Sequence, residues 1–121
     1  AQGVAGGLVE SVDIFPTLVK LADLPAPGHL QGASFTAALE NPEAELKPAV
    51  FPRWQNSDSI RTDRYYYTEW RDDKGQVSAN MLYDHAVDPG ELNNVAGDPE
   101  YALILNELSQ ALAEHIATSS Q

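Results

Sequence analysis

The chain has 121 residues, the length of one ordinary domain or a piece of one, and it is too short for two independent cores. Hydrophobic residues make up 43% and charged residues 21%, a mixture that can bury a core and excludes collagen-like and low-complexity proteins. Seven Lys and Arg against 18 Asp and Glu give a net charge of −11, which repels phosphate backbones and anionic lipid, so we expect no nucleic-acid partner.

Several features are absent from the sequence. It contains no cysteine, which excludes disulfides, thiolate metal sites and cysteine nucleophiles. No apolar run reaches the roughly 18–20 residues of a membrane helix, and the start AQGVAGGLVE is not a signal peptide, so we expect no membrane partner. The chain begins at Ala1 rather than with Met, which indicates a processed chain or a fragment.

The first predicted element is a helix over residues 12–23. Its apolar residues recur at helical spacing: Val12, Phe15, Leu18, Val19 and Ala22. Ser11 is placed to cap the helix, Pro16 is tolerated in a first turn, and Pro25 and Pro27 end it.

The next predicted segment, residues 25–48, is a connector. It contains Gly28, Gly32 and Pro42, and only SFTAALE has a helical pattern. We expect it to wrap over a surface, because it has no core of its own.

Residues 49–84 predict a small antiparallel sheet. Runs of β-branched and aromatic residues indicate strands at 49–52, 58–62, 64–70 and 80–84. Asp72-Asp73-Lys74-Gly75 has hairpin chemistry, since glycine accepts the positive φ of a tight turn.

The last predicted element is a helix over residues 99–117. Asp98-Pro99-Glu100 supplies an N-cap, a proline at the first helical position and an acid in the first turn. Leu105, Leu108 and Leu112 form an apolar stripe. The predicted fold is therefore α+β, a small four-stranded antiparallel sheet with the C-terminal helix packed on one face.

Two kinds of catalytic or metal site are rejected. His29, His85 and His115 could supply a nucleophilic triad, but no G-x-S-x-G elbow is present, and we expect His115 to be a solvent residue near a helix end. The segment LYDHAVDPGELNN gathers Asp84, His85, Asp88 and Glu91. It lacks the EF-hand pattern, since Ala86 and Pro89 stand at the third and sixth positions.

Five of the seven cations lie within 22 residues: Arg53, Arg61, Arg64, Arg71 and Lys74. The first interpretation is a set of salt bridges across strand faces. The second is that Arg53, beside Trp54, binds an anionic or sugar ligand. The aromatic residues Tyr65, Tyr66, Tyr67 and Trp70 could form a stacking platform, although strand alternation places one or two of them in the core.

Four segments stand in order along the chain: VDIFPTLVKLADLPAP, QGASF, SIRTDRYYYTEW and LYDHAVDPGELNNVAGDPE. With the patterns V-D-x-x-P-T-L, R-T-x-R-Y-x-Y-T-E-W and L-Y-D-x-x-x-D-P-x-E-x-x-N, this series resembles the C-terminal end of the sulfatase family, within the alkaline-phosphatase-like superfamily. The segments AVFPRW and YYYTEW look most like the iduronate-2-sulfatase-like branch.

The resemblance implies a catalytic centre elsewhere. Sulfatases carry a formylglycine, made in a C/S-x-P-x-R motif, and a calcium ion in a large α/β domain. This chain has no Cys and no S-x-P-x-R, so no catalytic or metal residue is carried over. We expect no cofactor in this chain, and calcium and formylglycine in a missing N-terminal domain of a parent protein that a periplasmic or secreted location would suit.

The resemblance also implies a division of the chain. Residues 1–24 correspond to the last helical segment of the large α/β domain, 25–48 to the connector and 49–121 to the C-terminal subdomain. The loop after the subdomain's first strand helps to choose the substrate in this family, and Phe51, Pro52, Arg53 and Trp54 map onto it. We therefore expect Arg53 and Trp54 to bind substrate.

Two hypotheses remain open. In the first, the chain is a sulfatase fragment that is inactive alone, completes the fold and shapes a pocket for a sulfated sugar. In the second, it is an independent glycan- or protein-binding module without catalysis. The apolar helix at 12–23 favours the first, because a free module should tolerate water on every face. No constellation supports a small stand-alone enzyme.

Overall fold

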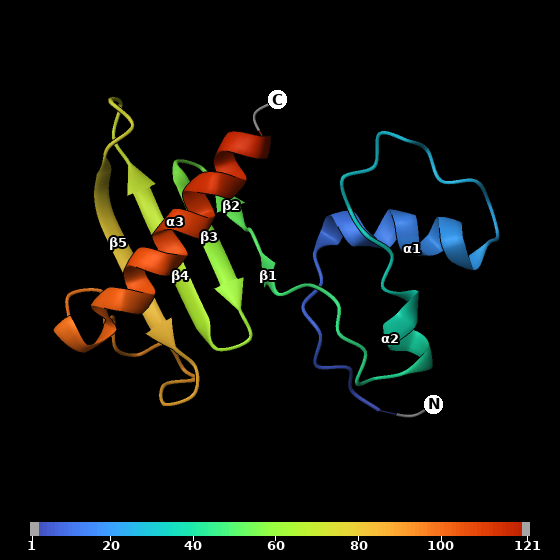
Figure 1. The fold of residues 1–121 in the computed structure, drawn as a ribbon, viewed down its shortest axis with the longest axis horizontal. Helices are drawn as coiled ribbons and strands as arrows, with labels where there is room; N and C mark the ends of the chain where they lie inside the picture. The colour runs from blue at the N-terminus through green and yellow to red at the C-terminus, as the bar shows by residue number, and fades with distance from the viewer. Residues whose placement is uncertain (1–2, 120–121) are drawn as a thin grey trace. The chain divides into compact units, whose positions relative to one another are not determined.

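The computed structural model describes residues 3–119, and these form two compact units that divide between Val50 and Phe51 (Figure 1). The first unit holds the 3₁₀ turn η1, two helices and the strand at its end: η1 Ser11–Asp13, α1 Ile14–Leu21, α2 Thr36–Glu40 and β1 Ala49–Val50. The second holds the other elements: β2 Arg53–Trp54, β3 Ser57–Thr62, β4 Tyr65–Arg71, β5 Val77–Asp84, η2 Pro99–Tyr101 and α3 Ala102–Ser119. The chain is therefore α+β, as predicted.

The first helix starts differently from the prediction. The N-cap of η1 is Glu10 rather than Ser11, because Glu10 and Asp13 form a capping box in which each side chain accepts from the other residue's backbone. Ser11 lies inside the turn. Pro16 stands in the first turn of α1, as its missing N–H requires.

The sheet is antiparallel from β2 through β5. Within the second unit β3 pairs with β2 and with β4, and β4 pairs with β5. The predicted strand at 49–52 is interrupted at Phe51 and Pro52, so five strands replace the predicted four. Pro52 nevertheless remains hydrogen-bonded to β3, since Ser59 N donates to Pro52 O at 2.9 Å. Strand β5 begins earlier than predicted because its pairing with β4 extends from Asp84 back to Val77.

The β4–β5 hairpin turns at Gly75, as predicted. Gly75 has a φ of 76°, which is the left-handed region that glycine tolerates. Asp72 Oδ1 accepts from the backbone N–H groups of Lys74 and Gln76 and closes the turn.

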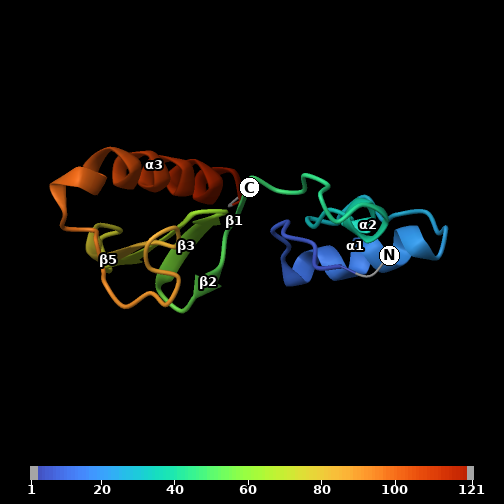
Figure 2. The ribbon, with the colours of Figure 1, turned by 90° about the horizontal axis from the view of Figure 1, so that it is seen from below.

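The core of the second unit lies between the sheet and α3. Ile60, Tyr67 and Leu82 are cross-strand neighbours and are all buried. Leu108 and Leu112 of α3 are buried too, and the helix covers one face of the sheet (Figure 2). Leu105, the third residue of the predicted stripe, is only half-buried. Within residues 3–119 no helix combines the length and the apolar composition needed to cross a membrane.

Candidate functional site

Arg53 and Trp54 form strand β2 instead of the predicted loop. Arg53 pairs with Asp58 and Trp54 with Ser57 in an antiparallel hairpin, in which Gln55 takes a φ of 53°. Ser57 Oγ donates to the carbonyl of Trp54 at 2.7 Å and holds the turn. The two candidate residues therefore have a backbone fixed by β3.

The Arg53 guanidinium forms an ion pair that leaves most of it in solvent. Its Nε lies 3.1 Å from Asp58 Oδ1, and the Arg53 side chain is 72% exposed. An exposed pair of this kind contributes about 0–1 kcal/mol. The pair orients the side chain, yet the unit does not depend on it for stability.

Arg53 lines a pocket of about 140 Å³ in the second unit, between the β1–β2 connection and the last turns of α3. The lining residues are Phe51, Pro52, Arg53, Asp58, Ser59, Leu112, His115, Ile116 and Ser119. The pocket therefore combines a cation, a carboxylate, an imidazole, hydroxyl groups and an apolar floor, which suits a small polar molecule with an apolar face.

His115 lines this pocket, so the prediction that it is a solvent residue near a helix end is wrong. Its ring stacks on Phe51 with centroids 3.7 Å apart and planes 1° apart. Ser119 Oγ lies 3.2 Å from His115 Nε2. No sequence pattern indicates this contact, because Phe51 lies 64 residues away from His115 and meets α3 only in the fold.

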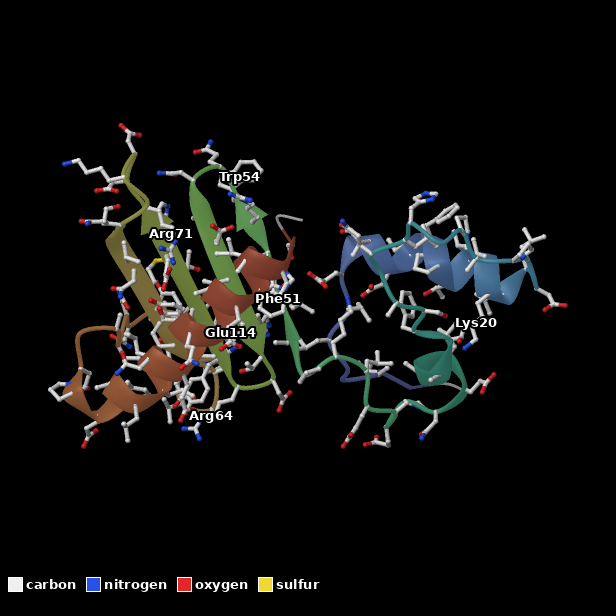
Figure 3. The ribbon with its side chains drawn as sticks, turned by 45° about the horizontal axis from the view of Figure 1, so that its top comes forward. Lys20, Phe51, Trp54, Arg64, Arg71 and Glu114 are labelled. Atoms are coloured by element: carbon white, nitrogen blue, oxygen red, sulfur yellow. The ribbon has the colours of Figure 1, made fainter. Side chains whose placement is uncertain are left out.

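Trp54 is not among the residues that line the pocket. Its side chain is 75% exposed, and Figure 3 shows it at the end of the β2–β3 hairpin, whereas Phe51 lies beside α3. Consecutive strand residues point to opposite faces, so Arg53 and Trp54 point apart. The two side chains cannot hold one sugar ring from the same side.

The other arginines of the predicted cluster have structural partners. Arg64 binds Asp84 through two nitrogens, Nε to Oδ1 at 2.8 Å and Nη2 to Oδ2 at 2.6 Å. The hydrogen bonds from Arg64 lower the pKa of Asp84 to about 2. The Arg61 guanidinium lies 6.0 Å from the Tyr66 ring centroid. These contacts agree with the first interpretation of the cluster, in which its arginines bind side chains of the sheet.

Glu69 is fully buried and was missed by the sequence analysis. Its carboxylate accepts from Tyr67 OH at 2.9 Å, from Ser109 Oγ at 2.5 Å and from Arg71 Nη2 at 2.5 Å. Burial raises the pKa of Tyr67. A signal was available, since Glu69 stands two residues from Tyr67 on a strand and so shares its face. The network ties α3 to the middle of the sheet.

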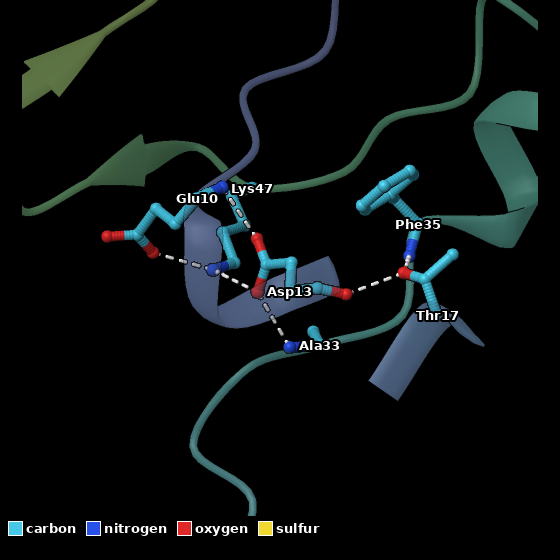
Figure 4. A network of polar contacts seen from close by, with 6 residues as sticks. All are labelled: Glu10, Asp13, Thr17, Ala33, Phe35 and Lys47. Atoms are coloured by element: carbon cyan, nitrogen blue, oxygen red, sulfur yellow. Dashed lines mark hydrogen bonds and ion pairs between the residues drawn. The ribbon is translucent and has the colours of Figure 1, made fainter. Parts of the chain in front are cut away.

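A second polar network organises the first unit (Figure 4). The carboxylate of Asp13, only 1% exposed, accepts from the N–H of Ala33 and from Lys47 Nζ, each at 2.8 Å. Thr17 Oγ1 donates to Asp13 O and accepts from the N–H of Phe35. Burial alone would raise the pKa of Asp13, but the hydrogen bonds from Lys47 and from two backbone N–H groups outweigh it and hold the pKa below its usual value.

These contacts explain two of the sequence patterns. Asp13 and Thr17 of V-D-x-x-P-T are four residues apart, so they share one side of the helix and bind the QGASF loop together. Gly32 passes so close to the turn that a Cβ there would lie 2.0 Å from the carbonyl oxygen of Val12. The loop therefore requires glycine at this position.

The acidic side chains at the end of β5 and just after it also bind other residues of the chain. Asp84 binds Arg64, His85 Nε2 lies 2.8 Å from Glu91 Oε1, and Asp88 Oδ2 accepts from the N–H of Asn93. Among residues 3–119 there is no group of three or more His, Cys, Asp or Glu side chains that could hold a metal ion.

The family model described as "N-sulphoglucosamine sulphohydrolase, C-terminal" matches residues 1–118. The Delta 4,5-hexuronate-2-O-sulfatase of Bacteroides thetaiotaomicron is 31% identical over a 118-residue alignment that covers 90% of this chain and 24% of that protein. The N-acetylglucosamine-6-O-sulfatase of the same organism is 30% identical, with 94% of this chain and 22% of that protein covered.

A solved structure is also similar. The structure of a protein in complex with its substrate D-glucosamine-2-N,6-O-disulfate superposes with a TM-score of 0.74 at 30% identity, over 85% of this chain and 23% of that one. The chain thus spans about a quarter of the length of the proteins it matches. With a family model that covers nearly all of it, the chain belongs to the sulfatase family, within the alkaline-phosphatase-like superfamily, as its C-terminal part.

Proposed function

We propose that this chain is the C-terminal part of a sulfuric ester hydrolase that removes sulfate from a sulfated sugar and is of the iduronate-2-sulfatase-like type. The observation that carries the proposal is the match of residues 1–118 to a sulfatase C-terminal family. Two relatives, the Delta 4,5-hexuronate-2-O-sulfatase and the N-acetylglucosamine-6-O-sulfatase, are named for sugar substrates, which supports a sugar substrate for this protein.

The chemistry of sulfate release belongs, in this proposal, to a domain outside these 121 residues. A sulfate ester needs an activated nucleophile and a charge-stabilising metal, which formylglycine and calcium would supply there. Residues 1–24 would complete that large domain, 25–48 would connect, and 49–121 would form the subdomain beside the active site.

Arg53 is the residue that we propose for substrate binding in this chain. Asp58 engages Nε and fixes the side chain, while its exposure leaves the guanidinium accessible to a sulfate or uronate oxygen. Trp54 would lie against a different part of the substrate, because strand alternation turns it away from Arg53.

The test is an Arg53→Ala variant of the whole protein, with Lys74→Ala as the control, since Lys74 is an exposed cation in the β4–β5 turn of the same unit. Loss of a substrate contact lowers kcat/KM and leaves the melting temperature nearly unchanged, and Arg53→Lys recovers only part of the activity. A kcat/KM within about twofold of the parent, equivalent to under ~0.5 kcal/mol, would remove the substrate role.

The competing function is an independent glycan- or protein-binding module. The exposed apolar side of α1 counts against this function, because an independent module is expected to bury such an apolar surface rather than expose it to water. Tight binding of a sulfated oligosaccharide to the isolated chain, abolished by Trp54→Ala, would favour the module instead.

A further inference from the structure

The pocket beside Arg53 is large enough for only part of a substrate. Its volume of about 140 Å³ is below the roughly 300–1,000 Å³ of sites that enclose a whole small molecule. Leu112 and Ile116 give it an apolar side, and with histidine counted as neutral its two formal charges are Arg53 and Asp58. The pocket therefore suits a single sugar unit, with C–H groups on the apolar side and polar groups toward Arg53 and Asp58.

Asp58 is the charged residue of this pocket that stability does not explain. Its ion pair with Arg53 is largely exposed on the arginine side, so it adds little to the stability of the unit. Directly across from it on β4 is Glu69, a second carboxylate, and like charges opposite each other in a sheet are unfavourable. A carboxylate kept at a position that disfavours it indicates a role in binding.

Arg53 and Asp58 present a hydrogen-bond donor beside an acceptor. The ion pair joins Arg53 Nε to Asp58 Oδ1 at 3.1 Å, and the Asp58 side chain has no other recorded partner among residues 3–119. This side chain is 13% exposed and lines the pocket, so it can accept a further hydrogen bond there. An ionised carboxylate only accepts, so its ligand must be a donor such as a hydroxyl group.

We propose that Asp58 is a specificity-determining residue, which accepts a hydrogen bond from a free hydroxyl of the sugar while Arg53 binds the neighbouring anionic group. This inference rests on the proposed function and narrows its substrate class. Besides the sulfate to be released, the sugar unit carries one anionic group, a carboxylate or a second sulfate, flanked by a free hydroxyl.

The selectivity comes from repulsion. A sulfate group in place of the free hydroxyl has no proton to donate to Asp58, and it brings a second negative charge to that carboxylate. Arg53 already neutralises Asp58 and binds the first anionic group, and the pocket lining contains no other Lys or Arg. The pocket therefore rejects the sugar that carries one sulfate more.

The experiment compares sugars that differ by one sulfate group in place of one hydroxyl. The first pair is a saturated hexuronate 2-O-sulfate and its 2,4-di-O-sulfate, which offer Arg53 a carboxylate. The second pair is glucosamine 2-N,6-O-disulfate and glucosamine 2-N,3-O,6-O-trisulfate, which offer it a sulfate. A guanidinium binds either group through paired donors, so each has its own arm. Sulfate release and equilibrium binding are both measured with the whole protein.

The variants are made in the whole protein. Asp58→Asn removes the charge and keeps the shape of the side chain, and Asp58→Ser is a second uncharged variant. Asp73→Asn is the matched control, because Asp73 is an exposed aspartate in the β4–β5 turn of the same unit. The melting temperature of each variant checks that it is folded.

The parent should prefer the less sulfated sugar of one pair by roughly tenfold or more, in kcat/KM and in affinity, and that pair identifies the group on Arg53. Both Asp58 variants should reduce the preference to less than about threefold, chiefly because they accept the more sulfated sugar better. Their melting temperatures should stay within about 2 °C of the parent or rise, since Glu69 loses a like-charged neighbour. Asp73→Asn should leave the preference within about twofold.

Three results would overturn the proposal. Equal use of both sugars in each pair by the parent would mean that no hydroxyl is read. A preference that survives in both Asp58 variants would assign the discrimination to other residues. A loss of kcat/KM by the same factor for both sugars, together with a lower melting temperature, would make Asp58 a structural residue.

Binding separates this inference from the proposed function. A parent protein that releases no sulfate, yet binds the less sulfated sugar in a way that depends on Asp58, would sink the proposed function and keep the role of Asp58. A parent protein that releases sulfate from other sugars but binds none of these four would do the reverse.

Discussion

The buried carboxylate of Glu69 makes a quantitative prediction about how α3 is held on the sheet. Ser109 Oγ donates to Glu69 Oε1 at 2.5 Å from α3, 40 residues further along the chain. Ser109→Ala removes this bond without opening a large cavity. A hydrogen bond to a charged group contributes about 1.5–3 kcal/mol, and since Glu69 is fully buried we expect water not to replace the lost donor.

Urea unfolding of the chain measures this loss directly. Both tryptophans, Trp54 and Trp70, lie in the second unit, so their fluorescence reports the unfolding of that unit. With a urea m-value of about 1–2 kcal/mol/M for a unit of this size, the midpoint should fall by roughly 1–2 M. Ser78→Ala is the control, because Ser78 also donates a side-chain hydrogen bond, at 3.1 Å to Trp70 O, but is exposed and should cost under ~0.5 kcal/mol.

A double mutant separates the charge from the hydroxyl. In a Glu69→Gln background the acceptor is neutral, so Ser109→Ala should cost about 0.5–1.5 kcal/mol, which leaves a coupling free energy near 1 kcal/mol. If Ser109→Ala shifts the free energy of unfolding by less than ~0.5 kcal/mol, or if the coupling is zero, then the network does not fasten α3 to the sheet.

Three further predictions follow from single contacts. Leu108→Ala should destabilise the second unit by about 2–5 kcal/mol in the same urea assay, and a change near zero would place this buried stripe in solvent. The folded pKa of Asp84 is about 2 against a usual 3.8, so the stability from its pair with Arg64 is present above about pH 4 and is lost as pH falls toward 2. Asp84→Asn should therefore flatten the acid dependence of the free energy of unfolding. An unchanged pH profile would contradict this prediction. Gly32→Ala should cost about 1–3 kcal/mol, seen as faster exchange of the Ala33 amide, because the added Cβ meets the Val12 carbonyl; unchanged exchange would show that the loop lies elsewhere.

Local rules of sequence were enough for part of the fold. Asp98 caps the last helical segment through Glu100 N at 2.9 Å, and the turn at Gly75 follows from its allowed positive φ. Leu108 and Leu112 were predictable from helical spacing alone. In each case the determining interaction lies within a few residues along the chain.

The missed features all depend on contacts between distant segments. Arg53 and Trp54 become a strand only because β3 is available to pair with them. The burial of Glu69 depends on Ser109 from α3, and His115 becomes a pocket wall only by stacking on Phe51. The residue types along one segment do not reveal which distant segment will contact it in the fold.

Release of inorganic sulfate is the reaction that a sulfatase performs, and it can be measured on the whole protein and on this chain alone. The whole protein that contains this chain and the 121-residue chain alone are each incubated with an aryl sulfate and with sulfated glucosamine and uronate sugars, and free sulfate is measured. We predict turnover of a sulfated sugar by the whole protein and background rates for the chain alone, because residues 1–121 contain no C/S-x-P-x-R nucleophile motif. A folded whole protein that releases no sulfate from any of these esters would contradict it. So would turnover by the isolated chain that disappears when one of its own residues is changed.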